Sequence, residues 1–313
     1  MGARTGSEYL DGLRQGNAEI WLGDERITDV TAHPALQGCA QSMAALYDMQ
    51  HTENLRDEMT YPSPTTGDPV GLSFITPRTH EDLEKRSGMM FNWSRFSGGM
   101  LGRSSDYINV EIMAAAAAAD FYHQNDPRFG ENARNYYEYA RENDLCMTHT
   151  LVNPQSNRAL TASGHPSTDV ALRIVDENAD GMVVRGARIL ATLGALADEI
   201  MVFPSTVLKA ASDTNSFAFA FTIPCGTPGM KFICRESLVY SESQIDHPLG
   251  SRFEEMDTIV VFDDVLHSNL IDRITRFGRV VGHMRAQHHI VEFEQWVFDR
   301  QRILLVNIES SCF

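Results

Sequence analysis

Residues 171–189 have the sequence ALRIVDENADGMVVRGARI, in which two β-rich runs flank a polar turn. The runs are Ala171–Val175 and Met182–Ile189, and the turn is Asp176–Gly181. β-Branched residues favour strands and polar segments with glycine favour turns, so this part of the chain predicts two strands joined by a turn. Further β-rich runs follow at Ile200–Phe203, Phe217–Ile223, Met230–Cys234 and Thr258–Phe262. Because no helical runs alternate with them, a parallel α/β sheet is disfavoured and an antiparallel β barrel or sandwich is predicted.

Both sides of this β region are predicted to be helical. Before it, Asp106–His123 contains six consecutive alanines, which favour helix and close packing, and Asn132–Asn143 forms a second helical run. After it, Ile274–Val297 carries apolar residues at helical spacing. We therefore predict a multidomain α+β chain with a helical domain at 1–145, a β domain at 146–265 and a helical segment at 266–313. This order occurs in flavoproteins whose β domain and helical bundles enclose the flavin ring, although order alone is weak evidence.

The charge of the chain excludes several classes of partner. Lys and Arg total 26 against 42 Asp and Glu, a formal net charge of −16. Such a surface repels nucleic acid and anionic membrane. No run approaches ~18 consecutive apolar residues, and Met1–Gly12 lacks the apolar core of a signal peptide, so neither a membrane span nor export is expected.

The five cysteines are too widely spaced for a disulfide framework or a zinc site, and they indicate buried thiols in a reducing cytoplasm. They are Cys39, Cys146, Cys225, Cys234 and Cys312. A metal site at His288 and His289 is also not expected, because adjacent residues on a helix point apart.

Three residues are candidates for binding and proton chemistry. Arg103 stands just before the alanine-rich helix and Tyr107 lies in its first turn, where free amides, a cation and a hydroxyl could hold a phenolate or carboxylate. His149 lies where the helical and β regions meet, and its ordinary pKa suits proton transfer from a phenol. The residues alone leave the alternative open that Arg103 pairs with a surface acid and that Tyr107 and His149 are structural.

Two further segments could contact a cofactor. Gln155 and Arg158, in the polar loop after Val152, could bind the carbonyls and phosphates of a nucleotide. The small residues of Gly186–Thr192 would let a flat ring approach the backbone, and Thr192 adds a hydroxyl. Ordinary turns would explain both segments equally well.

The chain resembles the oxygenase components of the 4-hydroxyphenylacetate 3-monooxygenase family, which are two-component, reduced-flavin-dependent phenol hydroxylases. The resemblance rests on many short segments that fall in family order between residues 4 and 265. They are Arg4-Thr5-Gly6 with Tyr9-Leu10, Asp29-Val30-Thr31 with His33-Pro34, Tyr47-Asp48, Ile75-Thr76-Pro77-Arg78-Thr79, Gly98-Gly99-Met100 with Gly102-Arg103-Ser104, Tyr137-Glu138 with Glu142-Asn143-Asp144-Leu145, His149 to Arg158, Gly186-Ala187 to Thr192, and Phe262-Asp263-Asp264-Val265.

The resemblance implies an acyl-CoA dehydrogenase-like fold: an N-terminal helical domain, a middle antiparallel β domain and a C-terminal helical bundle. It implies that side chains of the substrate site surround the phenol hydroxyl and that a second set contacts FAD. The catalytic residues would be Arg103, Tyr107 and His149, with Ser205 and Thr206 added to substrate binding, and the flavin contacts would be Thr150, Gln155, Arg158 and Thr192.

The implied reaction is ortho-hydroxylation of a para-substituted phenol, such as 4-hydroxyphenylacetate, through a C4a-hydroperoxide formed from reduced FAD (FADH2) and O2. The resemblance also implies a separate NAD(P)H:flavin reductase, since no dinucleotide glycine loop follows a strand here, and a homotetramer built around the helical bundle. After Val265 this chain departs from the family pattern with Leu266-His267-Ser268-Asn269, and only about one helix remains. We therefore expect a C-terminally truncated chain with a remnant of the bundle.

Two alternatives remain at this point. A 4-hydroxybutyryl-CoA dehydratase has a similar fold, but its iron–sulfur cluster needs several cysteines near Gly98–Tyr107, and no cysteine lies between Cys39 and Cys146. A degenerate, non-catalytic chain that binds flavin weakly is the other alternative. Iron analysis tests the first alternative and flavin titration the second.

Overall fold

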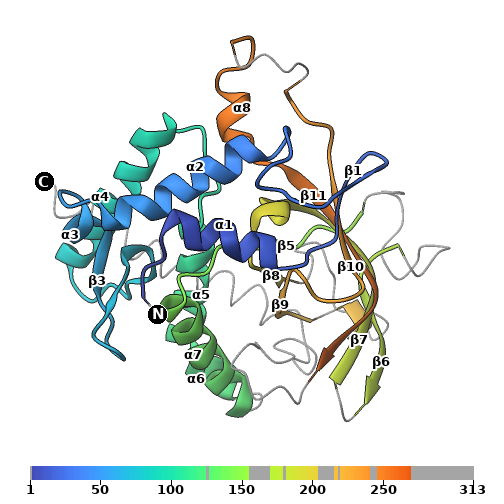
Figure 1. Cartoon of the computed structure of the whole chain (residues 1–313). Coiled ribbons are helices and arrows are strands. Elements are labelled where there is room, and N and C mark those ends of the chain that lie inside the picture. The colour runs from blue at the N-terminus through green and yellow to red at the C-terminus, as the bar shows by residue number, and fades with distance from the viewer. Residues whose placement is uncertain are drawn as a thin grey trace, which may run out of the picture.

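The computed structural model describes residues 2–124, 127–154, 170–178, 181–203, 215–217, 219–239 and 245–268. Figure 1 shows helices α1 to α7 on one side of the molecule and the six-stranded sheet on the other. The predicted order of a helical region followed by a β region is confirmed. The predicted helix Ile274–Val297 and the bundle remnant lie outside the described residues.

In its described residues, the helical region contains seven helices, two 3-10 turns and a short hairpin. They are α1 (Gly6–Gln15), α2 (Gln37–Asp48), η1 (Met49–His51), α3 (Arg56–Met59), β3 (Thr60–Pro62), β4 (Pro69–Gly71), η2 (Leu72–Phe74), α4 (His80–Ser97), α5 (Asp106–Ala117), α6 (Ala119–His123) and α7 (Pro127–Glu142). A capping box begins α4, where Asp82 N donates to Thr79 Oγ1 at 3.2 Å and Thr79 N donates to Asp82 Oδ2 at 2.9 Å. The predicted helix Asp106–His123 is present as two helices that meet at Ala118.

The β region contains two sheets. Its elements, with the hairpin from the N-terminal region, are β1 (Ile20–Leu22), β2 (Glu25–Ile27), β5 (Met147–Thr150), β6 (Arg173–Asn178), β7 (Gly181–Thr192), η3 (Gly194–Leu196), β8 (Glu199–Val202), η4 (Asn215–Phe217), β9 (Phe221–Pro224), β10 (Met230–Cys234), α8 (Gly250–Phe253) and β11 (Asp257–Ser268). One sheet has the order β2-β1-β10-β11-β7-β6 and the other β5-β8-β9.

Most strand pairs are antiparallel, as predicted, and β6 and β7 form the ladder expected from residues 171–189. Two pairs, β1 with β10 and β5 with β8, are parallel. These strands are far apart in the chain, so no short turn forces an antiparallel arrangement on them. Strand β11 continues to Ser268, three residues beyond the predicted boundary at Val265.

The larger of two hydrophobic clusters among the described residues joins the helices to the large sheet. It contains Tyr9 of α1, Met43 of α2, Phe232 of β10 and Val260 of β11, each with no exposed surface. Burial of such side chains supplies about 1.5–3 kcal/mol each. The helical and β regions therefore stabilise each other across their contact.

A buried ion pair reinforces this contact. The guanidinium of Arg4 lies 2.7 Å from Asp198 Oδ2 and over the rings of Tyr9 and Tyr47, at 5.6 and 5.0 Å from their centroids. Asp198 Oδ2 also accepts the backbone N–H of Cys146 at 2.7 Å. Arg4 thus ties the N-terminal segment to the start of β5 and to the end of η3.

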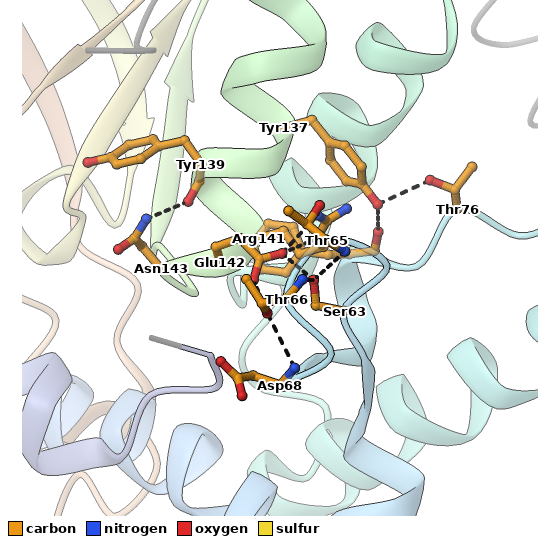
Figure 2. A network of polar contacts seen from close by, with 11 residues as sticks. Ser63, Thr65, Thr66, Asp68, Thr76, Tyr137, Tyr139, Arg141, Glu142 and Asn143 are labelled. Carbon is orange, nitrogen blue, oxygen red and sulfur yellow. Dashed lines mark hydrogen bonds and ion pairs between the residues drawn. The ribbon is translucent and has the colours of Figure 1, made fainter.

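The C-terminal end of α7 is held by a polar network, which Figure 2 shows. The Glu142 carboxylate accepts hydrogen bonds from Ser63 Oγ at 2.6 Å and Thr66 Oγ1 at 3.0 Å, and Arg141 Nη2 donates to Thr65 Oγ1 at 2.8 Å. Because α7 leads through residues 143–146 directly into β5, this network fixes the direction in which β5 leaves the helical region.

Candidate functional site

Tyr107 and His149 meet at the contact between the helical and β regions. Tyr107 lies in the first turn of α5, and His149 is the half-buried residue of β5, whose other residues are buried. The Tyr107 hydroxyl is 3.0 Å from His149 Nδ1, and the two rings lie edge to face with centroids 5.4 Å apart. The two residues that were predicted to share a site are therefore in direct contact.

Arg103 completes the cluster with a full positive charge. Its guanidinium carbon lies 5.3 Å from the centroid of the Tyr107 ring, a cation–π arrangement. The side chain is exposed, and no ion pair of Arg103 with a carboxylate occurs among the described residues. The predicted alternative, that Arg103 is neutralised by a surface acid, has no support in this part of the chain.

Both titratable rings are held in their neutral forms. Burial, with a smaller contribution from the Arg103 cation, lowers the pKa of His149 to about 4. Burial raises the pKa of Tyr107 to about 12. With Tyr107 as a neutral hydroxyl donor, Nδ1 of a neutral His149 is the acceptor, and the ring hydrogen is then on Nε2. His149 therefore presents an N–H donor on the side away from Tyr107.

Threonines join β5 to β7 next to this cluster. Thr148 Oγ1 donates to the carbonyl oxygen of Thr192, and Thr150 Oγ1 donates to that of Ile189 at 2.9 Å. Thr192 Oγ1 donates to Asp257 Oδ1 at 2.5 Å. Four residues were predicted to contact a flavin, and the structure describes two of them, Thr150 and Thr192. Thr150 is fully buried and Thr192 half-buried, so Thr192 is the more accessible of these two.

An apolar groove of about 510 Å³ lies on the outer face of β7 and β11. Its lining includes Gly186, Ala187, Ile189, Ile259 and Val261. Gly186 has a φ of 123°, and a Cβ there would lie 2.6 Å from the carbonyl oxygen of Ala171, so a side chain would strain this part of the groove. Of the predicted segment Gly186–Thr192, the groove is lined by Gly186, Ala187 and Ile189.

Comparison with known proteins places these features in a family. A family model described as "4-hydroxyphenylacetate 3-hydroxylase N terminal" matches residues 5–266. The chain belongs to this family. The oxygenase component of 4-hydroxyphenylacetate 3-monooxygenase from Geobacillus sp. (strain PA-9) is 48% identical over 297 residues, which are 92% of this chain and 60% of that relative.

The family assignment agrees with the three-dimensional comparison. The crystal structure of an oxygenase component of 4-hydroxyphenylacetate 3-monooxygenase, complexed with FAD and 4-hydroxyphenylacetate, matches with a TM-score of 0.80 and 45% identity, covering 89% of this chain and 56% of that one. The chain thus spans between half and two thirds of the length of these relatives.

The fold is acyl-CoA dehydrogenase-like, as the resemblance implied. An archaeal 4-hydroxybutyryl-CoA dehydratase from N. maritimus has the same fold, with a TM-score of 0.76 at 17% identity and coverage of 88% of this chain and 54% of that one. Within the described residues, no group of three His, Cys, Asp or Glu side chains could hold a metal ion. None of the helices described is both long and apolar enough to cross a membrane.

The structure brings together most, but not all, of the predicted site residues that it describes. Arg103, Tyr107 and His149 form one cluster, and Thr150 and Thr192 lie on the strands beside it. The remaining predicted residues lie outside the described part of the chain. They are Gln155, Arg158, Ser205 and Thr206.

Sequence analysis missed two acidic residues of this site. Glu255 accepts the backbone N–H of Arg103 at 2.7 Å, and Asp257 accepts the hydroxyl of Thr192. Both precede the β-rich run Thr258–Phe262, and acids at the start of a strand carry no pattern that indicates a distant partner. The only indication in the sequence that Glu255 and Asp257 belong to one site is that they lie two positions apart on one segment.

Proposed function

We propose that this chain binds a para-substituted phenol and FAD as part of the oxygenase component of a two-component flavin monooxygenase, which hydroxylates the phenol ortho to its hydroxyl. The observation that carries the proposal is the cluster of Arg103, Tyr107 and His149, in which a cation without an ion pair among the described residues and a neutral imidazole converge beside a tyrosine. The family membership supports the same reaction class.

The cluster is suited to stabilising a phenolate. An ortho carbon is a much better nucleophile in a phenolate than in a phenol, so the site must favour negative charge on the substrate oxygen. The Arg103 cation supplies that charge stabilisation, and His149 Nε2–H donates a hydrogen bond to the same oxygen. Tyr107 fixes the imidazole in the tautomer that leaves Nε2–H available, since its hydroxyl occupies Nδ1.

His149 acts in this scheme as a hydrogen-bond donor more than as a base. Because its pKa is lowered to about 4, holding the phenol proton on the imidazole is unfavourable unless the phenolate lies beside it. The proton of the phenol is therefore released to solvent, and the neutral ring polarises the oxygen that remains.

The chain also offers surfaces that fit FAD. The apolar groove lined by Gly186 and Ala187 has a volume of about 510 Å³, and Thr192, farther along the same strand β7, carries a hydroxyl group. When bound, reduced FAD would supply the activation of O2, and the chain's own residues would hold the ring and exclude water from it.

The reduced flavin is proposed to come from a separate NAD(P)H:flavin reductase. The relative from Geobacillus sp. is named as an oxygenase component, a name that implies a second component. Four buried free cysteines, Cys39, Cys146, Cys225 and Cys234, are compatible with the cytoplasmic location that we propose. A homotetramer, as the family resemblance implies, is the assembly that we propose for the complete oxygenase.

Titration of the purified chain with oxidised and reduced FAD, followed by incubation with reduced FAD, O2 and a phenol panel, tests the proposal. The panel contains 4-hydroxyphenylacetate, a tyrosine-like acid and a chlorophenol, and mass spectrometry detects a new ring oxygen. We expect flavin binding and a catechol product. Flavin binding without new ring oxygen from any phenol would favour a non-catalytic flavin-binding chain and would refute the proposed reaction.

A further inference from the structure

A short acidic segment, residues 254–257, leads from the end of α8 into the first residue of β11 and contacts several parts of the site. Glu254 Oε1 pairs with Arg235 Nη1 at 2.6 Å, Glu255 binds the backbone of the loop before α5, and Asp257 binds Thr192. Glu254 and Asp257 share Arg235, whose Nε lies 3.8 Å from Asp257 Oδ2, whereas Glu255 binds the loop before α5. The segment therefore connects Thr192, which was predicted to contact flavin, with the loop that carries Arg103.

This segment is itself firmly held. The backbone carbonyl of Met256 accepts from Leu193 N at 3.1 Å, and Arg235 N donates to the carbonyl of Asp257 at 3.1 Å. Glu254 is buried and also accepts from Ser237 Oγ at 2.8 Å. Glu255 therefore projects from a fixed backbone, and its carboxylate can act as an anchor for a more exposed partner.

The loop of Gly102 and Arg103 is such a partner. Both residues are exposed, and Glu255 accepts the backbone N–H of Arg103 at 2.7 Å. The neighbouring Gly102 amide also favours the charged form of the Glu255 carboxyl, since it acts to lower the pKa of that group. Among the described residues, the other hydrogen bonds of Arg103 and Ser104 side chains are local, to Gly102 O at 3.4 Å and to Asp106 Oδ1 at 2.5 Å. Hydrogen bonds to a carboxylate are about twice as strong as neutral ones, so Glu255 is the main attachment of this loop to the β region.

The position of this attachment decides where Arg103 points. The Arg103 guanidinium lies over the Tyr107 ring, and the loop backbone between the two residues sets that geometry. If the backbone at Arg103 is released, the long side chain gains rotamer freedom and its charge is no longer held over the cluster. The carboxylate of Glu255 also attracts the Arg103 cation, although the cation is not paired with it.

We propose that Glu255 is a positioning residue, which anchors the Gly102–Arg103 backbone to the β region and thereby holds the Arg103 cation at the phenol site. The proposal rests on the proposed function for its phenol-binding part, whereas the anchoring of the loop is a property of the chain alone. It assigns a role in substrate positioning to a residue that lies 152 positions from its partner.

Hydrogen exchange of the loop amides tests the anchor without any ligand. The variants are Glu255→Ala, which removes the acceptor, and Glu255→Gln, which keeps a neutral one, with Glu236→Ala as the control for loss of an exposed carboxylate from the same region. We expect exchange at Gly102 and Arg103 to rise about tenfold or more in Glu255→Ala, with a smaller rise in Glu255→Gln and none in the control. Exchange in α2 and β10 reports whether each variant is folded. Unchanged exchange at Gly102 and Arg103 in a folded Glu255→Ala or Glu255→Gln variant overturns the proposal.

A double-mutant cycle tests whether Glu255 acts through Arg103. The dissociation constant for 4-hydroxyphenylacetate is measured by calorimetry for the wild type, Glu255→Ala, Arg103→Ala and the double variant. We expect Glu255→Ala to weaken binding about tenfold in the wild type and to have almost no further effect when Arg103 is absent. Additive losses would overturn the positioning role. Absence of phenol binding by the wild type would refute the proposed function and the phenol-positioning role together, and the exchange result would still decide whether Glu255 anchors the loop.

Discussion

The neutral state of His149 makes the stability of the protein depend on pH in a defined window. The pKa of His149 falls from an ordinary 6.5 to about 4, first because the ring is buried and second because Arg103 is close. The difference corresponds to roughly 3 kcal/mol in favour of the neutral ring. As the pH falls below the His149 pKa of the unfolded chain, His149 becomes protonated in the unfolded chain but stays neutral in the folded chain. Stability is therefore lost with falling pH until the pKa of the folded chain is reached. Near pH 5 the loss from His149 alone should be roughly 2 kcal/mol.

Urea denaturation of the wild type and His149→Gln at about pH 7 and about pH 5 measures this loss. The glutamine variant keeps a polar side chain but no titrating ring, so its stability should fall less between the two conditions, by roughly 2 kcal/mol. His80→Gln, a change of an exposed histidine on α4, serves as the control and should behave as the wild type. NMR titration of the imidazole gives the pKa directly, and Arg103→Ala should raise it. A His149 pKa at or above about 6, or equal pH dependence in wild type and His149→Gln, would refute the assignment of a buried neutral imidazole.

Three further predictions concern charge at and around the site. Arg103→Ala should lower phenol hydroxylation by on the order of 10²-fold and increase release of hydrogen peroxide, measured as product and peroxide formed per FADH2 consumed. Asp198→Ala should cost about 3 kcal/mol in urea denaturation, because it removes the carboxylate that pairs with the Arg4 guanidinium, whose side chain is only 13% exposed. Arg4→Met combined with Asp198→Ala should recover part of the loss. Arg188 is fully buried on β7, and its guanidinium has no hydrogen-bond partner among the described residues. Because an unpaired buried cation is destabilising, Arg188→Met should leave the melting temperature equal or higher. A lower melting temperature would indicate instead that this cation binds a group, which calorimetry would detect.

The sequence was sufficient to predict elements whose formation depends on near neighbours. The strands predicted at 171–189 pair in the structure as β6 and β7. The cap of α4 by Thr79 and Asp82 is likewise a contact between residues three positions apart. The break at Ala118 was missed because a run of identical alanines favours helix everywhere and indicates no end. The parallel pairing of Ile20 with Phe232 was not predictable, because it depends on a contact between distant segments that share no local pattern.

In the candidate site, too, the features set by near neighbours in the sequence were predictable, and the contacts between distant segments were not. The positions of Arg103 before a helix, of Tyr107 in its first turn and of His149 where the helical region ends could be derived from the sequence. Their contact could not, because it depends on how α5 packs against β5. Neutralisation of His149 could not be predicted either, since the lowered pKa follows from burial in the folded chain.

The hydrogen bonds around the site form a closed path through four separate segments. From His149 on β5, a hydrogen bond leads to Tyr107, and a cation–π contact leads from Tyr107 to Arg103. The backbone N–H of Arg103 then donates to Glu255, which belongs to the acidic segment at the start of β11. Asp257 of that segment binds Thr192, whose carbonyl accepts the hydroxyl of Thr148 and so returns the path to β5. A closed path of this kind resists distortion more than an open chain of contacts, because a shift of one segment must strain at least two links. Substitutions at Glu255 and at Asp257 should therefore affect both the phenol end and the Thr192 end of the site, although each residue touches only one of them.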